Sequence, residues 1–239
     1  MPRRPNCSAA SADFPMSLHL PCPNCGADVV FRSPALPARV CDTCHSMLVR
    51  SDAGLAQFGI AAALPFDVSP VQIGMRGTDA GQAFEVIGRV RWSWTDGAWN
   101  EWLLLFEDGG TAWLGEAMGQ FMLLREYPFG DVRSKTLRAV ANGEPAQVGG
   151  RIELFGRKLA ITDARQALCI TAEGELPFVA PSGWQVYNVD LRGPDGECVS
   201  LQRDGKATSF YRGRYVTLAE LAPCGLRAIE GWALPDYAA

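Results

Sequence analysis

Histidine is scarce in this sequence, and its scarcity limits the chemistry that the chain can perform. Among the 239 residues there are two histidines, His19 and His45, and both lie near the N-terminus. Ser-His-Asp and Cys-His catalytic centres need a histidine beside the nucleophile. We therefore expect neither centre in the remainder of the chain.

Long hydrophobic runs are also missing. A membrane-spanning helix needs roughly 20 consecutive apolar residues, whereas runs such as "WLLLFEDG" (102–109) are soon interrupted by charge. Residues 1–18 carry two arginines but no continuous apolar core, so we expect a flexible leader there and no secretory signal. These absences predict a soluble protein of the cytoplasm without a membrane span.

Neither sign of charge dominates the composition. The chain has 22 basic and 26 acidic residues, which gives a net charge of −4. A broad nucleic-acid surface normally requires a basic domain, so the composition argues against this class of partner. The glycine-rich stretches lead into strand-like sequence and not into a helix, which argues against a phosphate-cradling loop.

Cysteine, in contrast, occurs in a specific pattern. Cys22, Cys25, Cys41 and Cys44 form the spacing Cys-x2-Cys-x15-Cys-x2-Cys. Two such pairs can direct four thiolates at one tetrahedral Zn²⁺, as in zinc ribbons. Four protein ligands would leave no coordination position for water, so this zinc would be structural. A redox dithiol and an iron–sulfur site are the alternatives.

The paired cysteines define the expected domain organisation. We expect a zinc ribbon over residues 19–50, with "GADVVFRS" and "SMLVRS" as its strands. Residues 51–69 are mostly small and apolar and are followed by Pro70, which is typical of a linker that forms a helical turn or lies on a neighbouring domain. Ribbons of this kind bind protein or nucleic acid, or serve as docking and stabilising modules, and this one is only faintly basic.

The remaining residues are typical of an antiparallel β fold. Short β-branched and aromatic runs alternate with Asp-Gly and Gly punctuation, which favours hairpins. The segment "DVRSKTLRAVANG" (131–143) is the best helix candidate, with Asp131 or Ser134 as its cap and Gly143 at its end.

An internal repeat divides this β region. "VQIGMRGTDAGQAFEVI" (71–87) aligns without gaps with "AQVGGRIELFGRKLAIT" (146–162), and the alignment pairs Gly81 with Gly156. The sequence therefore predicts two tandem, related antiparallel modules, SH3-like or small barrels, over residues 70–143 and 144–239. The alternative is that any two antiparallel strand pairs look alike at this level of detail.

Several motifs together resemble a known family. They follow the ribbon and are "SPVQIGMRG" (69–77), "FEVIGR" (84–89), "DGAWNEWLLLFEDG" (96–109), "WLGEAMG" (113–119) and "GELP" (174–177). The chain resembles bacterial proteins that carry domain of unknown function 4178, over nearly its whole length. The resemblance implies a β-rich cytoplasmic protein, sometimes with an N-terminal ribbon, and gene neighbourhoods that involve polyamine synthesis and small membrane proteins. It implies no catalytic residues.

The "WNEW" motif supplies the main candidate site. Strand alternation directs Trp99 and Glu101 to one face and Asn100 and Trp102 to the other. A carboxylate beside an indole can act as an acid of raised pKa or as a clamp for a cation. A structural role for Glu101, paired with nearby arginines or turn backbone, is the alternative that we favour from the sequence.

The candidate ligand-binding residues are taken from two aromatic motifs. They are Trp99, Glu101, Trp102, Trp113 and Glu116. If the protein is an enzyme, Glu101 and Glu175 are the candidate acid and base.

The sequence as a whole favours an adaptor or ligand-binding protein with a structural zinc ion. The expected partner is another protein, with a polyamine or another small cation as a further candidate ligand. A hydrolase or polyamine-related enzyme is the first alternative, and nucleic-acid binding through the ribbon is the second.

Overall fold

The computed structural model describes residues 17–64, 67–205, 207–231 and 233. The leader expected over residues 1–18 falls almost entirely outside this part, and the first strand begins at Leu18. The described residues form a mainly β structure, as the sequence predicts, with a large antiparallel sheet and a small separate one. No helix among them has the length and apolar character needed to span a membrane.

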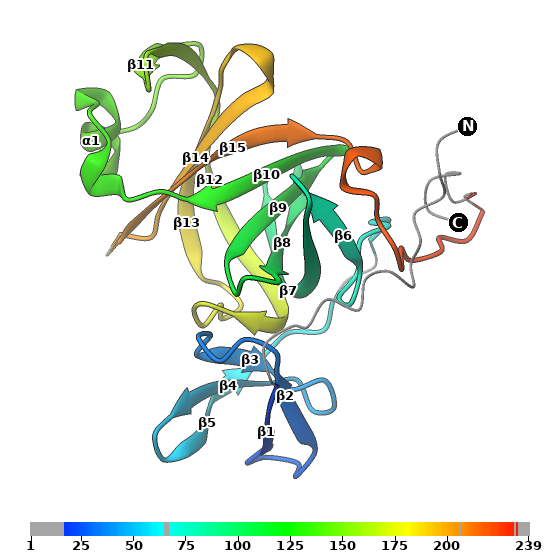
Figure 1. Ribbon diagram of the computed structural model, residues 1–239. Helices are drawn as coiled ribbons and strands as arrows, with labels where there is room; N and C mark the ends of the chain where they lie inside the picture. Colours follow the sequence, from blue (N-terminus) through cyan, green and yellow to red (C-terminus); the bar gives the residue numbers. More distant parts are fainter. Residues whose placement is uncertain (1–16, 65–66, 206, 232, 234–239) are drawn as a thin grey trace.

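The N-terminal strands form the ribbon expected around the cysteine pairs. Its five strands are β1 (Leu18–Pro21), β2 (Asp28–Phe31), β3 (Ala38–Val40), β4 (Ser46–Ser51) and β5 (Gly54–Ile60). Strands β1 and β2 pair as a hairpin, and β3, β4 and β5 form a second small layer at the bottom of Figure 1.

Strand β5 lies in the segment that the sequence predicts as a linker with a helical turn. Its residues pair with β4 from Ser51 and Gly54 at the turn to Ser46 and Ile60 at the far end. A tight turn at positions 52 and 53 returns the chain along β4, so the backbone groups of this apolar segment hydrogen-bond to the ribbon. The chain passes from the ribbon to the barrel after Ile60.

Ten further strands follow in two groups of five. The first group contains β6 (Arg76–Asp79), β7 (Gln82–Trp94), β8 (Gly97–Phe106), β9 (Thr111–Ala117) and β10 (Gln120–Glu126). The second contains β11 (Arg151–Leu154), β12 (Arg157–Leu176), β13 (Gln185–Arg192), β14 (Glu197–Arg203) and β15 (Thr208–Val216). We call these groups the first and the second unit.

The two units close into one barrel and do not form two separate small ones. Strands β7 to β10 pair in sequence, as do β12 to β15. The units then join at two seams, β10 with β15 and β7 with β12, both antiparallel. The ring of strands β7-β8-β9-β10-β15-β14-β13-β12 therefore closes on itself (Figure 1), which satisfies the backbone groups that two open sheets would expose.

The first hairpins of the two units have the same backbone features 75 residues apart. Ala80 and Gly81 have φ of 49° and 84°, and Phe155 and Gly156 have φ of 54° and 74°. Positive φ at both central residues is the signature of a type I′ hairpin turn. The ladders are then interrupted by a bulge at equivalent places, after Val86 in β7 and after Ile161 in β12.

The helix predicted between the units is α1 (Lys135–Ala141). Ser134 is its N-cap, because its hydroxyl accepts the backbone N–H of Leu137, and Gly143 follows the last turn with φ of 113°. Three short 3₁₀ turns complete the described structure: η2 (Phe129–Asp131), η3 (Pro194–Gly196) and η4 (Ala219–Leu221).

Strand alternation divides the barrel residues among three cores. Leu103, Val186, Cys198 and Tyr211 come from opposite sides of the ring yet belong to one hydrophobic cluster, so this cluster fills the barrel interior. Outside the first unit a second cluster packs Trp102 and Leu104 under η4 and the C-terminal segment. A third cluster packs α1 and β11 against the outside of the second unit.

Candidate functional site

The four paired cysteines meet at one point of the ribbon. Their sulfur atoms all lie within 4.8 Å of one another, with Sγ–Sγ distances of 3.7 Å between Cys22 and Cys44 and 3.8 Å between Cys25 and Cys41. A tetrahedral zinc ion with sulfur ligands at about 2.3 Å requires sulfurs about 3.8 Å apart. The cluster therefore suits a metal ion held by four thiolates.

The backbone around these sulfurs has the form of a metal-binding knuckle. Gly26 donates its N–H to the carbonyl of Cys22 and has φ of 75°, which glycine adopts without strain. The second pair repeats this turn, because His45 donates its N–H to the carbonyl of Cys41 with φ of 57°. His45 is exposed and is not part of the sulfur cluster.

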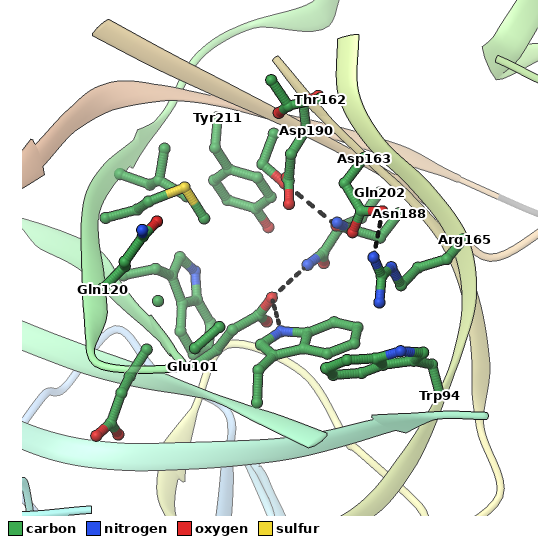
Figure 2. A pocket seen from close by; sticks show the side chains of 18 of the residues that line it. Trp94, Glu101, Gln120, Thr162, Asp163, Arg165, Asn188, Asp190, Gln202 and Tyr211 are labelled. Carbon is green, nitrogen blue, oxygen red and sulfur yellow. Dashed lines mark hydrogen bonds and ion pairs between the residues drawn. The ribbon is translucent and has the colours of Figure 1, made fainter. Parts of the chain in front are cut away.

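A cavity of about 530 Å³ opens inside the barrel, and we call it the inner cavity. Both units contribute to its lining. The first unit provides mainly apolar and aromatic groups, including Trp99, Trp113, Met122 and Leu124. The second unit provides a polar wall from β13 and β14, which consists of Asn188, Asp190, Ser200 and Gln202. Figure 2 shows Glu101 and Asp190 pointing into the space between these walls.

Glu101 is held in the inner cavity by donors and not by a cation. Its carboxylate accepts the indole N–H group of Trp92 at 2.8 Å. It also accepts the indole N–H of Trp99 at 3.2 Å and the side-chain amide N–H of Gln202 at 2.7 Å (Figure 2). Burial, with a smaller contribution from the nearby Asp190, raises the pKa of Glu101 from 4.5 to about 7, against the effect of the three donors. Glu101 thus changes its charge near neutral pH.

Asp190 is the second carboxyl of this cavity. Burial raises its pKa from 3.8 to about 6, against the effect of hydrogen bonds from Ser200 and Asn188. Its Oδ1 atom is buried and has no hydrogen-bond partner. Burying a polar atom without a hydrogen-bond partner costs free energy. A donor group on a ligand would offset this cost at Oδ1 of Asp190.

One basic side chain lines the same cavity. Arg165 is paired with Asp163 at 2.5 Å and lies over the ring of Trp94, with its guanidinium carbon 4.5 Å from the ring centre (Figure 2). Among the residues that the structure describes, no salt bridge joins Glu101 or Asp190 to a basic group. When these acids ionise, the cavity therefore carries uncompensated negative charge.

The structure brings together four of the five ligand-binding residues predicted from the sequence. Trp99, Glu101, Trp113 and Glu116 line the inner cavity. Trp102 does not, because alternation along β8 directs it to the outer core of the first unit. There its indole N–H binds Glu116 at 2.9 Å.

The arginines considered as partners of Glu101 lie on the other side of the strand. Arg89 and Arg91 bind Asn100 and Asp67 instead. Alternation along β7 and β8 separates them from Glu101, which faces the interior.

Glu175 lies away from the inner cavity, at the contact between the ribbon and the barrel. Its carboxylate is completely buried and accepts the backbone N–H groups of Arg32 and Ser33 and the guanidinium of Arg39. It is not among the residues that line the inner cavity. Glu101 and Glu175 therefore do not form an acid–base pair in this structure.

Sequence reasoning did not single out the polar wall of the second unit. Asn188, Asp190 and Gln202 lie at alternate positions of "QVYNVDLR" and "ECVSLQR", a pattern that any half-exposed strand shows. Only closure of the ring directs them toward Glu101. A polar residue at alternate positions of two neighbouring strands was the one available signal.

Residues 72–218 match the family described as Domain of unknown function (DUF4178). The chain belongs to this family. The matched range contains all ten strands of the two units and both walls of the inner cavity, whereas the ribbon precedes it. No curated protein and no solved structure matches the chain. The barrel is thus the unit that defines the family.

Proposed function

We propose that the protein binds a small organic cation in the inner cavity. The observation that carries this proposal is the presence of two carboxyls, Glu101 and Asp190, in an aromatic-walled cavity, neither of which forms a salt bridge within the described part of the chain. An ammonium group there would supply the missing counter-charge and a donor for Oδ1 of Asp190. Indole and phenyl faces also attract cations within about 6 Å.

The two walls define the chemistry of this ligand further. Trp113 stacks on Phe178 with ring centres 5.9 Å apart, and Met122 and Leu124 continue this apolar surface. The polar wall of Asp190, Asn188 and Gln202 faces it from the second unit. An amine with an apolar body matches both walls better than a fully polar cation does. A polyamine would place methylene groups on the aromatic wall and leave further charges to be satisfied.

Calorimetric titration with octylamine tests this proposal, with octanol as the uncharged control of the same chain length. We expect octylamine to bind more tightly as the pH rises through the range in which Asp190 and Glu101 ionise. Asp190→Asn and Glu101→Gln should each weaken binding about tenfold, which corresponds to about 1.4 kcal/mol. Glu173→Gln, which removes a carboxyl outside the cavity, should leave binding unchanged.

Two results would contradict the proposal. Equal affinity for octylamine and octanol would show that charge is not recognised. Wild-type affinity in the Asp190→Asn Glu101→Gln double variant would show that the amine binds elsewhere. Titration with spermidine in parallel compares a polyamine with the amphipathic amine.

We also propose that the metal of the ribbon is zinc and that its role is structural. Four thiolates at tetrahedral spacing are the preferred ligands of structural zinc, and they leave no open position. The adaptor role and protein partner stay predictions, as do the cytoplasmic location and the bacterial origin. Nucleic-acid binding receives no support from the ribbon, because Arg32, Arg39 and Arg50 are all engaged within the protein.

The matching hairpins, bulges and strand order support a further proposal, that the two units arose by duplication. The pairing of β7 with β8 and of β12 with β13 extends this correspondence to the next strand of each unit. Glu101 then corresponds to Asn188, and Leu103 corresponds to Asp190. The interior has therefore diverged into one mainly apolar and one polar wall, as a barrel that binds an amphipathic ligand requires.

A further inference from the structure

A second cavity lies outside the barrel wall, beside β7 and β8. Its volume is about 720 Å³, and we call it the outer cavity. Apolar side chains provide most of its lining, among them Phe121, Leu218 and Leu226. Two arginines, Arg91 and Arg227, also line it. The outer cavity shares Trp99, Glu116 and Met118 with the inner one, so that a single layer of side chains separates the two.

The two arginines of the outer cavity share one ion-pair partner. Asp67 pairs with three guanidinium groups, those of Arg89, Arg91 and Arg227. The other acid of the lining, Glu116, accepts its hydrogen bonds from Ser69, Asn100 and Trp102, which are all neutral. Arg89 has a second carboxylate partner, Glu173 at 3.3 Å, so among the described residues Asp67 is the carboxylate paired with both arginines of the lining, Arg91 and Arg227.

Arg91 has unused donors at this place. Its Nη1 atom binds Asn100 at 3.0 Å and lies 3.3 Å from Asp67, but its Nε atom is buried and has no hydrogen-bond partner. Within the described part of the chain, no hydrogen bond involves its Nη2 atom either. Nε–H and Nη2–H are the parallel donors with which a guanidinium binds a carboxylate through both oxygens. Burial and the neighbouring Arg89 and Arg227 lower the pKa of Arg91, although Asp67 and Glu116 oppose this effect.

Arg165 of the inner cavity differs from Arg91 in the number of acids around it, and this number decides whether an anionic ligand is favoured. Its Nε atom also lacks a partner. However, the acids that line that cavity outnumber this single arginine, and Asp163 pairs with it directly. The outer cavity instead has two arginines, Arg91 and Arg227, for its two acids, Asp67 and Glu116.

We propose that the outer cavity binds an apolar monocarboxylate, with the carboxylate on Arg91 and the hydrocarbon part against Phe121, Leu218 and Leu226. The carboxylate completes the hydrogen bonds of the Arg91 guanidinium, whose ion-pair partner Asp67 is shared with Arg89 and Arg227. The apolar lining accounts for the remainder of the ligand. This site is distinct from the cation site and does not depend on it.

Calorimetric titration of the full chain with octanoate tests this site, with octanol as the uncharged control. We expect octanoate to bind in the millimolar range or more tightly, and octanol to bind at least about tenfold more weakly. Arg91→Lys keeps the charge but removes the paired donors, and it should weaken octanoate binding about tenfold or more. Arg192→Lys is the matched control, because Arg192 lies on β13 over Tyr215 and does not line the outer cavity.

A second variant keeps the proposal testable if Arg91→Lys does not fold. Val68 is 56% exposed on the rim of the outer cavity, so Val68→Glu should fold normally and repel a carboxylate. The proposal is overturned if octanoate does not bind up to about 5 mM, if octanol binds equally well, or if both variants bind octanoate like the wild type.

The cation site is followed separately with octylamine. Arg91→Lys should leave octylamine binding unchanged, since Arg91 does not line the inner cavity. Loss of octanoate binding alone then concerns the outer cavity, and failure of octylamine to bind the wild type concerns the proposed function. A decrease of both affinities in Arg91→Lys would contradict two independent sites.

Discussion

Glu101 illustrates how one residue can be fixed in place and still remain available for a ligand. Its two oxygens accept hydrogen bonds from two indoles and one amide, and these donors orient it toward the inner cavity. The same burial that fixes it disfavours its charge. A structural carboxylate would normally have a basic partner, and Glu101 lacks one among the described residues.

The pH dependence of stability tests this description of Glu101. Its pKa rises on folding from 4.5 to about 7, so the folded protein holds the proton more tightly than the unfolded chain does. The stability due to this group is therefore present below about pH 4.5 and is lost as the pH rises to about 7, by about 3 kcal/mol at most. We expect denaturant unfolding of Glu101→Gln to show a weaker decrease over this range than the wild type.

Glu101→Gln changes the hydrogen bonds as well as the charge, but that effect does not depend on pH. The comparison of slopes therefore isolates the titration. Identical slopes for wild type and variant between about pH 5 and pH 8 would show that Glu101 has an ordinary pKa.

Glu175 represents the opposite case, a carboxylate whose partners all come from the ribbon. We expect Glu175→Gln to lower the free energy of unfolding by about 2–4 kcal/mol, because an amide would direct a donor at Arg39 or at a backbone N–H. Glu173→Gln is the matched control, because Glu173 is 41% exposed and its ion pair with Arg89 is partly solvated, so its loss should lower stability by no more than about 1 kcal/mol. Equal thermal midpoints for the two variants would contradict an anchoring role.

At the scale of elements, the two seams depend on close approach of strands. A Cβ atom on Gly213 would lie 1.8 Å from the carbonyl oxygen of Leu123 across the β10–β15 seam. A Cβ atom on Gly88 would lie 1.9 Å from the carbonyl oxygen of Glu175 near the β7–β12 seam. Both contacts involve backbone, which cannot move without opening the ladder.

Gly213→Ala should therefore destabilise the protein by about 3 kcal/mol through overpacking. Gly115→Ala is a control on the neighbouring part of the ring, because its Cβ atom would meet nothing closer than 3.6 Å. Alanine is favoured over glycine in a strand, so this control should be neutral or slightly stabilising. Denaturant unfolding measures both changes, and equal effects would show that the seam tolerates a side chain.

Strand β12 connects the two parts of the molecule. Its first residues pair with β11, residues 160–168 pair with β13, residues 168–174 pair with β7, and its last two residues pair with β3 of the ribbon. The ribbon is thus joined to the barrel by backbone hydrogen bonds as well as by Glu175.

At the scale of the whole molecule, this junction predicts that the metal stabilises the barrel. A chelator would remove the proposed zinc ion, whose binding free energy contributes to the folding of the ribbon. Glu175 would then lose the donors that compensate its burial, so we expect the barrel to stay folded but to melt at a lower temperature. Cys41→Ser should have the same effect.

Tryptophan fluorescence separates the barrel from the ribbon in this experiment. All seven tryptophans lie after residue 91, and the ribbon has none. A lower midpoint of the tryptophan signal after chelation, restored by added zinc, is the expected result. A midpoint that does not change would show that the ribbon folds and unfolds without affecting the barrel.

The sequence by itself determined the features that depend on short spacing. The two Cys-x-x-Cys turns, the Ser134 cap and the paired hairpin turns at Gly81 and Gly156 each involve residues close in the chain, whose local geometry follows from residue type. Alternation within β8 likewise separated Trp99 and Glu101 from Asn100 and Trp102 correctly.

Tertiary structure alone decided which of these features meet. Antiparallel strands can pair in two small barrels or in one ring with equal local propensity, and only the register of the two seams places Asp190 opposite Glu101. The same long-range pairing removed Glu175 from the cavity and placed it under the ribbon. Contacts between residues about a hundred positions apart depend on the packing of whole elements, which no local pattern in a single sequence specifies.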